Sequence, residues 1–495
     1  MVAIERLRGS REDAEKLPRW LVRAITTEDV VFVVFVGGLA WVPFWFASNR
    51  PIPWGINALL FSGLAALYEL ALLLRGAARP VAIRNVWLPA VLFALAATWA
   101  LFQNATWAPA AWQHPIWELA SEVLGRPIPG SISVDRDLTA IALLRLMTAA
   151  SVFWLALQLC RDAARARLLI WAVAGIGAIY AAVGLFALGF LPGGTVFPEL
   201  NSSPFVTSTF VNQNHYATFA GIGLVAAVAG ILRLYRRAFA QSGRILRLKV
   251  ATLIRMSGSQ GALPLALALL ILAALLLSGS RGGIISTALG LFVLITLNLR
   301  RTKRSSRNEA LLTIFAFLLV GVAFIGFGDA FVGRLETQGL HDENRLPVAI
   351  VTIWSILSSP LLGFGYGTFL AAFPMFRDDS MSIWSFWDRA HNTYLEVFQG
   401  LGLVFGAMLI ANVVLLVWEC IKGARTRQRD ATIAAVAASV SFLVGVHALV
   451  DFSLQIQAVT LTYMAVLGAG VAQARDDAQL QHSSLHYSRA SDYNR

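Results

Sequence analysis

The chain has 495 residues, of which 57% are apolar and 14% are charged, and its mean hydropathy is +0.66. This composition excludes an ordinary soluble protein and indicates a protein of the lipid bilayer. The formal net charge of +12 would suit a nucleic-acid partner. However, the basic residues gather in short stretches between apolar runs, which indicates contact with membrane lipids and predicts no nucleic acid.

Apolar runs recur along the whole chain, and each is long enough to cross a hydrocarbon core of about 30 Å as a helix. Because a spanning helix satisfies its own backbone hydrogen bonds, the sequence predicts an all-α integral membrane protein, a bundle of about twelve transmembrane helices. The expected spans are residues 30–47, 56–74, 86–102, 138–159, 168–190, 215–232, 263–279, 284–299, 310–327, 397–418, 431–449 and 455–472.

The distribution of lysine and arginine sets the orientation. With the N-terminus inside, most of the 40 Lys and Arg residues fall on inner segments, as the positive-inside rule requires. Both termini are therefore expected in the cytosol. The domains expected are a cytosolic arm (1–29, with a surface helix near 19–25), spans 30–327, a large outer loop (328–396), spans 397–474 and a disordered tail (475–495).

Four polar groups fall on the same outer side of this topology. They are the approach to the sixth span, the turn between the seventh and eighth spans, the large loop and the last outer turn. Their polar residues include Asn212, Asn214 and His215; Ser280 and Arg281; Arg345, Arg389, His391, Asn392 and Tyr394; and His447 and Asp451.

Arg281 lies between a serine and two glycines at the outer end of a span. Glycine permits a close backbone approach, and the guanidinium group presents a planar fork of donors that matches phosphate oxygens. The same position also suits an arginine that anchors the helix end at lipid headgroups. Arg345 is expected to begin an amphipathic helix that runs to about Ser358, with a solvated loop arginine as the alternative.

His391 is the strongest candidate for catalysis. Imidazole titrates near neutral pH, so a histidine beside Asn392 at the membrane boundary can act as a general base towards a hydroxyl. A hydrogen-bonded interfacial histidine is the alternative. His215 and His447 suit binding or structural roles, and Arg145 within the fourth span is expected to face the bundle interior.

Metal and disulfide sites are not indicated. We interpret the acidic pairs Asp135/Asp137 and Asp378/Asp379 as solvated charges in loops. The two cysteines lie far apart in the sequence. The sequence therefore predicts no metal site and no cofactor.

Six motifs follow one another on the expected outer face: Phe210-Val211-Asn212-Gln213-Asn214-His215, Ser280-Arg281-Gly282, Asn344-Arg345 with Trp354, Gly363-Phe364-Gly365-Tyr366-Gly367-Thr368-Phe369, His391-Asn392-Thr393-Tyr394-Leu395, and His447-Ala448-Leu449-Val450-Asp451-Phe452. In this order they resemble the bacterial O-antigen ligase and O-antigen polymerase family, which are multi-pass glycosyltransferases of the GT-C type in the inner membrane.

The resemblance implies a metal-independent transferase of lipopolysaccharide or exopolysaccharide biosynthesis with a periplasmic active site. The donor would be a glycan on undecaprenyl diphosphate, and the acceptor a hydroxyl of lipid A core or of another lipid-linked glycan. His391 would activate that hydroxyl, while Arg281 and Arg345 would bind the diphosphate. The substrate-binding residues implied are Arg389, Asn392, Tyr394, Asn212, Asn214 and His215.

Three functions remain open from the sequence. A ligase and a polymerase share these motifs, and a ligase that glycosylates secreted proteins differs only in its acceptor. Twelve spans with both ends inside also suit a polysaccharide or lipid-linked glycan transporter or flippase, although its polar residues would lie near the bilayer midplane. The sequence also leaves open whether a flippase and a chain-length regulator are partners.

Overall fold

A computed structural model describes residues 26–197, 199, 202–241, 261–299, 345–378, 386–427 and 431–475, with residues 236–241, 299 and 345 in backbone only. Within these ranges the chain forms helices and turns without strands. The expected helix at 19–25 and span at 310–327 lie outside the described residues, as do nearly all of the expected N-terminal arm and C-terminal tail. The α-helices are α3 (Thr27–Trp41), α4 (Pro51–Leu74), α5 (Trp87–Gln103), α6 (Ile116–Leu124), α7 (Arg136–Leu159), α8 (Ala163–Phe190), α9 (Gln213–Gln241), α11 (Ala262–Leu277), α12 (Arg281–Leu299), α15 (Arg345–Ser358), α16 (Phe369–Ala372), α17 (Thr393–Thr426), α18 (Ala431–His447) and α19 (Gln457–Ala472).

Seven helical segments of the described chain are long and apolar enough to cross a membrane. Four shorter apolar helices, including α11, α18 and α19, accompany them. The chain is thus a multi-pass, all-helical protein of membrane character, while the number of twelve spans stays a prediction. The seven segments are Pro51–Leu74, Ile83–Gln103, Arg136–Leu159, Ala163–Phe190, Gln213–Tyr235, Arg281–Asn298 and Thr393–Thr426.

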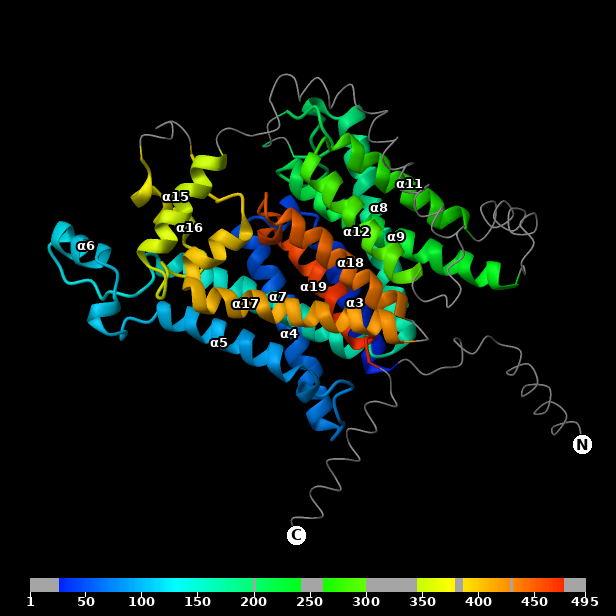
Figure 1. Cartoon of the computed structure of the whole chain (residues 1–495), viewed down its shortest axis with the longest axis horizontal. Helices are drawn as coiled ribbons and strands as arrows, with labels where there is room; N and C mark the ends of the chain where they lie inside the picture. The colour runs from blue at the N-terminus through cyan, green and yellow to red at the C-terminus, as the bar shows by residue number, and fades with distance from the viewer. Residues whose placement is uncertain are drawn as a thin grey trace, which may run out of the picture.

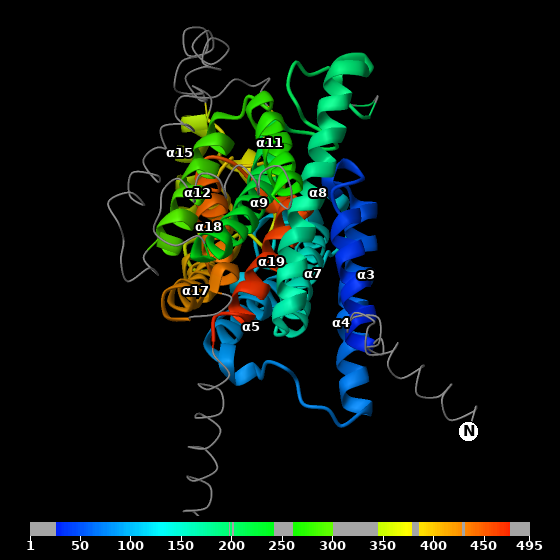
Figure 2. The same cartoon turned by 90° about the vertical axis from the view of Figure 1, so that its right-hand side faces the viewer.

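The core of the bundle is built around α19, which is buried along almost its whole length. It packs against α7, α18 and α17 and also touches α8 and α9 (Figure 1). Small residues let these helices approach closely, as membrane helices commonly do. Where α8 crosses α9, a Cβ atom on Gly177 would lie 3.1 Å from the Cα atom of Gly223. The helices α3 and α4 run side by side along one edge, next to α8 (Figure 2).

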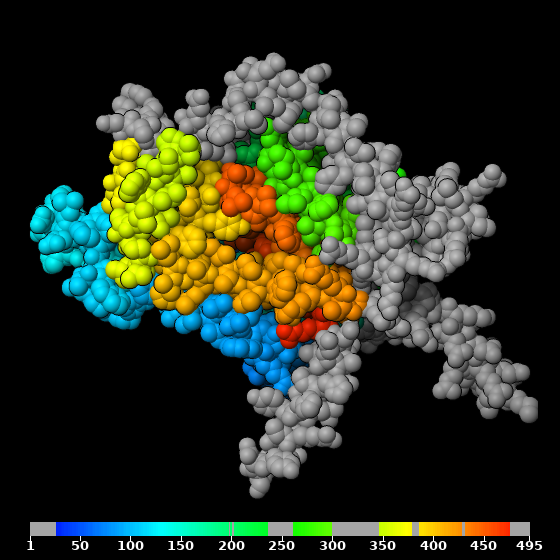
Figure 3. All heavy atoms as spheres, viewed as in Figure 1, coloured from blue at the N-terminus to red at the C-terminus, as the bar shows by residue number. Residues whose placement is uncertain are grey.

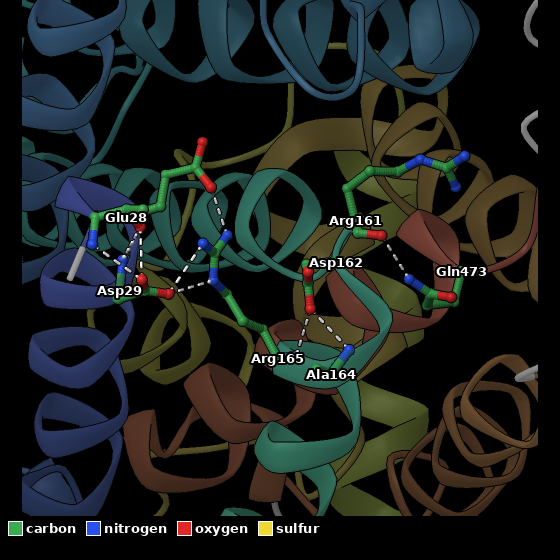
Figure 4. A network of polar contacts seen from close by, with 8 residues as sticks. Glu28, Asp29, Arg161, Asp162, Ala164, Arg165 and Gln473 are labelled. Atoms are coloured by element: carbon green, nitrogen blue, oxygen red, sulfur yellow. Dashed lines mark hydrogen bonds and ion pairs between the residues drawn. The ribbon is translucent and has the colours of Figure 1, made fainter. Parts of the chain in front are cut away.

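One end of the bundle is tied by charged and polar contacts between α3, α8 and α19 (Figure 4). The guanidinium of Arg165 on α8 donates to Glu28 at 2.5 Å and to Asp29 at 3.0 Å at the start of α3. Just beyond α19, Gln473 donates to the backbone carbonyls of Cys160 and Arg161. These contacts bring the beginnings of α3 and α8 together with the ends of α7 and α19. This arrangement is expected when helices cross the bundle in alternating directions.

The opposite end, where α7, α9, α12 and α17 begin and α18 ends, is called the site end below. At this end the segment with α6 lies near α15 and α16 (Figure 1). The backbone N–H of Val134 donates to the carbonyl of Phe364 at 3.0 Å, and these two side chains pack with Ala372 and Ile116. The predicted outer loop 328–396 thus includes helices, and α15 begins and ends where the sequence predicted a helix.

The glycine-rich motif at 363–369 packs against a break in α17. Within α17, Gly402 has a φ of 74° and interrupts the helix. The N–H groups of Phe364 and Gly365 donate to the carbonyls of Gln399 and Gly400, each at 3.0 Å. This motif is therefore part of the packing that fixes the first two turns of α17, and those turns follow directly on His391 and Asn392.

Candidate active site

Three helices begin and one ends at the centre of the site end. The helices α9, α12 and α17 begin there, and α18 ends there. The unpaired N–H groups of a helix start and the helix dipole favour an anion. Figure 3 shows α17 and α18 side by side on one face of the molecule, next to α12. Side chains join these four helix ends to one another.

The start of α9 is bonded to the segment just before α12. The hydroxyl of Ser280 donates to the Oδ1 atom of Asn214 at 2.7 Å. The side chain of Asn212 in turn accepts from the backbone N–H of Asn214 at 2.7 Å, so it caps the first turn of α9. Arg281 is the first residue of α12 and is half-buried. The structure thus brings the Asn-Gln-Asn-His and Ser-Arg-Gly motifs into direct contact.

The start of α12 packs closely on the end of α18. A Cβ atom on Gly282 would lie 2.9 Å from the Nε2 atom of His447. The other ring nitrogen of His447, Nδ1, lies 2.5 Å from the hydroxyl oxygen of Thr218 on α9. His447 is 1% exposed and therefore connects α9, α12 and α18 from the interior, which agrees with the structural role considered for it.

A short polar chain continues from Thr218 to the turn after α18. The hydroxyl of Thr218 also lies 3.0 Å from the hydroxyl of Ser453, and Ser453 donates to the carboxylate of Asp451. Burial raises the pKa of Asp451, but the neighbouring His215 and His447 and the hydrogen bond from Ser453 outweigh it, so the pKa lies below its ordinary value. A buried, ionised carboxylate therefore lies at the centre of the site end.

Two histidines lie on either side of Phe452. The His215 ring is 4.5 Å from the Phe452 ring, and the His391 ring is 5.0 Å from it, both edge to face. The Nε2 atom of His215 lies 3.6 Å from Oδ2 of Asp451. His391 also contacts the ring of Trp387 at 5.4 Å. His391, the predicted catalytic base, is thereby placed beside the acid and the histidine from the other two motifs.

The backbone around His391 is held in an unusual conformation. His391 has a φ of 53°, in the left-handed region that a side chain with a Cβ atom seldom adopts. On one side, the N–H of Ala390 donates to the carboxylate of Glu396 at 2.8 Å. On the other, the N–H of Thr393 donates to the carbonyl of Ala448 at 2.9 Å. Such strain persists only where the surroundings fix it, and it is common at functional sites.

Asn392 and Tyr394, predicted to bind substrate, both bond to the protein itself. The side chain of Asn392 caps α17 by accepting from the N–H groups of Tyr394 and Leu395, and it donates to the carbonyl of Leu449 at 2.9 Å. The hydroxyl of Tyr394 donates to the carbonyl of Gly445 at 2.8 Å. These contacts fix α17 against α18, and a role in substrate binding stays a prediction.

The predicted arginines differ in their placement. Arg389 is half-buried two residues before His391 and donates to the carbonyl of Asp388 at 3.1 Å. Arg145, inside α7, donates to the carbonyl of Gln455 and stacks over the ring of Trp54 at 4.5 Å. It faces the bundle interior, as its cost in lipid predicts. Arg345 begins α15, and its side chain lies outside what the structure describes.

Sequence reasoning missed Thr218, Ser453 and Glu396. Thr218 follows Asn214 by one helical turn, and Glu396 follows Asn392 by one turn, so this spacing was the available signal. Within the described ranges, no group of three or more histidine, cysteine or acidic side chains is placed to hold a metal ion. Both cysteines are buried free thiols.

A sequence model described as O-antigen ligase matches residues 266–411, which include Arg281, Arg345 and His391. No curated protein matches the chain. The matched region, the order of the motifs and their meeting at one end of a helical membrane protein define a glycosyltransferase-like class. Over residues 266–411 the chain is thus similar to the O-antigen ligase family.

Proposed function

We propose that the protein transfers a glycan from undecaprenyl diphosphate to an acceptor hydroxyl at the periplasmic face of the bacterial inner membrane, as an O-antigen ligase or a polysaccharide polymerase. The observation that carries this proposal is the position of His391 beside Asp451 and Phe452, at the site end, close to where α9, α12 and α17 begin. A base and an anion-binding environment therefore lie together, which is what the reaction needs.

In the proposed reaction, His391 and the two arginines have different roles. The acceptor oxygen forms a bond to the anomeric carbon of the glycan while the bond from that carbon to the diphosphate breaks. His391 takes the proton of the acceptor hydroxyl, and the departing lipid diphosphate keeps the bonding electrons. Arg281 and the starts of α9 and α12 stabilise the growing negative charge, with Arg345 as a second arginine of the same role.

The ionised carboxylate of Asp451 supports the base. When His391 becomes an imidazolium, a buried negative charge nearby stabilises it. A lipid-linked donor and a lipid-anchored acceptor both lie at membrane depth, so their positioning at one site supplies much of the remaining rate. The proposed topology places both termini in the cytosol and this site outside.

The proposal is tested by the glycan profile of cells that lack the protein and carry either the wild type or His391→Gln. If the protein is a ligase, cells without it keep finished polymer on the lipid carrier. If it is a polymerase, they keep single repeat units on the carrier. His391→Gln should reproduce the loss, with transfer by the purified variant reduced by about 10²-fold to 10⁴-fold.

His114→Gln is the matched control, because the His114 ring contacts Phe364 and has no described contact with His391, Asp451 or Phe452. It should retain transfer. If cells with His391→Gln have a normal glycan profile, His391 is not the base. If cells without the protein accumulate the donor on the cytosolic side of the membrane, the protein is a transporter of the donor and not a transferase.

A further inference from the structure

A polar cavity lies beside the candidate active site. It is a hollow of about 460 Å³, open on one side, and it is lined by Arg50 just before α4, by Thr195 and Glu199, by the segment 202–211 and by the first turn of α9. Hydroxyl and amide side chains line most of it, with Arg50 and Glu199 as the charged groups among the described residues. Its volume lies within the range of about 300–1,000 Å³ that is usual for small-molecule sites.

Thr207 is one of the residues that line this cavity, and its hydroxyl oxygen is buried. Its side chain is 5% exposed, and no described residue forms a hydrogen bond with its Oγ1 atom. The backbone holds the residue in place, because its carbonyl accepts from Phe210 at 3.0 Å and the preceding Val206 donates to Leu277 at 3.1 Å. A buried hydroxyl without a partner is unfavourable, and a ligand in the cavity would supply the missing hydrogen bond.

Arg50, which lines the cavity, lies over an aromatic pair. Its guanidinium carbon is 4.9 Å from the centre of the Phe46 ring, and that ring stacks on Phe197 at 4.2 Å. The only hydrogen bond described for the guanidinium goes to the carbonyl of Asn49. Most of its donors therefore remain available to a ligand.

An unusual turn holds this arrangement. The three residues before Asn49, Phe46 to Ser48, have φ values of 49°, 55° and 53°. The hydroxyl of Ser48 donates to the carbonyl of Val42 at 2.6 Å, and its carbonyl accepts from the indole of Trp54 at 2.7 Å. Three consecutive left-handed residues are costly, and here the surrounding hydrogen bonds fix them.

The first turn of α9 is a wall shared by the cavity and the active site. Asn214 lines the cavity and accepts from Ser280, the neighbour of Arg281. The next residue, His215, turns towards Asp451. A molecule in the cavity is therefore separated from the catalytic cluster by one turn of helix.

From these observations we infer that the cavity binds a saccharide unit of the glycan substrate. Sugar hydroxyls both donate and accept hydrogen bonds, as the hydroxyls and amides of the lining do. The acidic Glu199 in the same lining as Arg50 makes the cavity unsuited to a purely anionic ligand. The inference rests on the proposed function, and the saccharide belongs to either the donor or the acceptor.

A binding measurement without glycan transfer tests this inference separately from the proposed function. The probe is the oligosaccharide released by mild acid from the lipid-linked donor, titrated against the full chain in lipid nanodiscs. Thr207→Val and Arg50→Gln should each raise Kd by about fivefold to tenfold. His391→Ala should leave Kd unchanged, and so should the matched controls Thr148→Val and Arg84→Gln, which lie outside the cavity.

Two results would overturn the inference. One is an unchanged Kd for the oligosaccharide in both Thr207→Val and Arg50→Gln. The other is binding of inorganic pyrophosphate that depends on Arg50 while the oligosaccharide does not bind, which would make the cavity an anion site. In transfer assays, a raised KM for the donor alone assigns the cavity to the donor glycan, and a raised KM for the acceptor alone assigns it to the acceptor. Unchanged values for both contradict a role in transfer.

Discussion

The Nε2 atom of His215 and the Oδ2 atom of Asp451 lie 3.6 Å apart, and both side chains are almost fully buried. They come from residues more than 200 positions apart, on α9 and on the turn between α18 and α19. The distance exceeds a normal hydrogen bond, and the two groups form an ion pair only when the imidazole is protonated. Among the described residues, neither Nε2 of His215 nor Oδ1 of Asp451 has a hydrogen-bond partner. The centre of the site thus holds two buried polar atoms that form no hydrogen bond with the described residues.

Asp451→Asn is expected to lower kcat by about 10-fold to 10³-fold with little change in KM, because the imidazolium of His391 loses a neighbouring negative charge. The acid limb of the pH–rate profile should move to lower pH for the same reason. The measurement is transfer by purified protein between pH 5 and 9. A reduced kcat without movement of the acid limb would show that Asp451 acts only through the fold.

Asp451 also makes stability depend on pH. Its pKa in the folded protein is lowered from 3.8, so the carboxylate contributes stability above that value and loses it as the pH falls through the folded pKa. In thermal unfolding of the protein in detergent, the difference in Tm between wild type and Asp451→Asn should shrink as the pH falls below about 4. A difference that stays constant down to pH 2 would contradict this linkage.

Gly282→Ala should disturb the site without removing a polar group. The added Cβ atom would lie 2.9 Å from Nε2 and 3.0 Å from Cδ2 of His447, so the imidazole must shift, which disturbs its hydrogen bond with Thr218. We expect transfer to fall by about 10-fold, with a stability loss of about 1–3 kcal/mol. Gly175→Ala on α8 is the control, because no atom lies within 4 Å of its added Cβ. Equal activity in the two variants would show that the ring position is not critical.

Arg165→Gln should destabilise the end of the bundle opposite the site. Its side chain is 10% exposed and binds Glu28 and Asp29, so its loss leaves two acids without their cationic partner. We expect a loss on the order of 2 kcal/mol. Lys422→Gln breaks the exposed pair with Glu419 and should change stability by less than about 1 kcal/mol. Thermal unfolding of both variants in detergent gives the comparison, and equal shifts would contradict the importance of burial.

The order of motifs and the inside-outside distribution of charge predicted that His215, Arg281, His391 and Asp451 gather on one side of the membrane, and the structure places these residues at one end of the bundle. The partners of each side chain could not be predicted in the same way. Membrane helices are apolar towards lipid as well as towards protein, so the sequence does not show which way a helix is rotated. For that reason the contact of Thr218 with His447 and the cavity at Arg50 emerge only from the fold.

The glycine-rich motif offers the sharpest test of how the fold supports the site. At Gly363, φ is 68° and an added Cβ atom would lie 2.4 Å from the carbonyl oxygen of Gly400. That oxygen is backbone and cannot turn aside, so Gly363→Ala should cost about 2–4 kcal/mol and shift the start of α17 that follows His391. Gly76→Ala is the matched control, since Gly76 has a φ of 60° and no atom within 4 Å of the added Cβ.

The control should show the cost of the left-handed conformation alone, about 1 kcal/mol, and should keep full transfer activity. Gly363→Ala should show a larger fall in Tm together with reduced kcat, because the loop and the break in α17 no longer fit. Thermal unfolding and transfer assays on the two purified proteins make the comparison. If both alanines lower Tm equally and leave kcat unchanged, the close approach of the motif to Gly400 does not position His391.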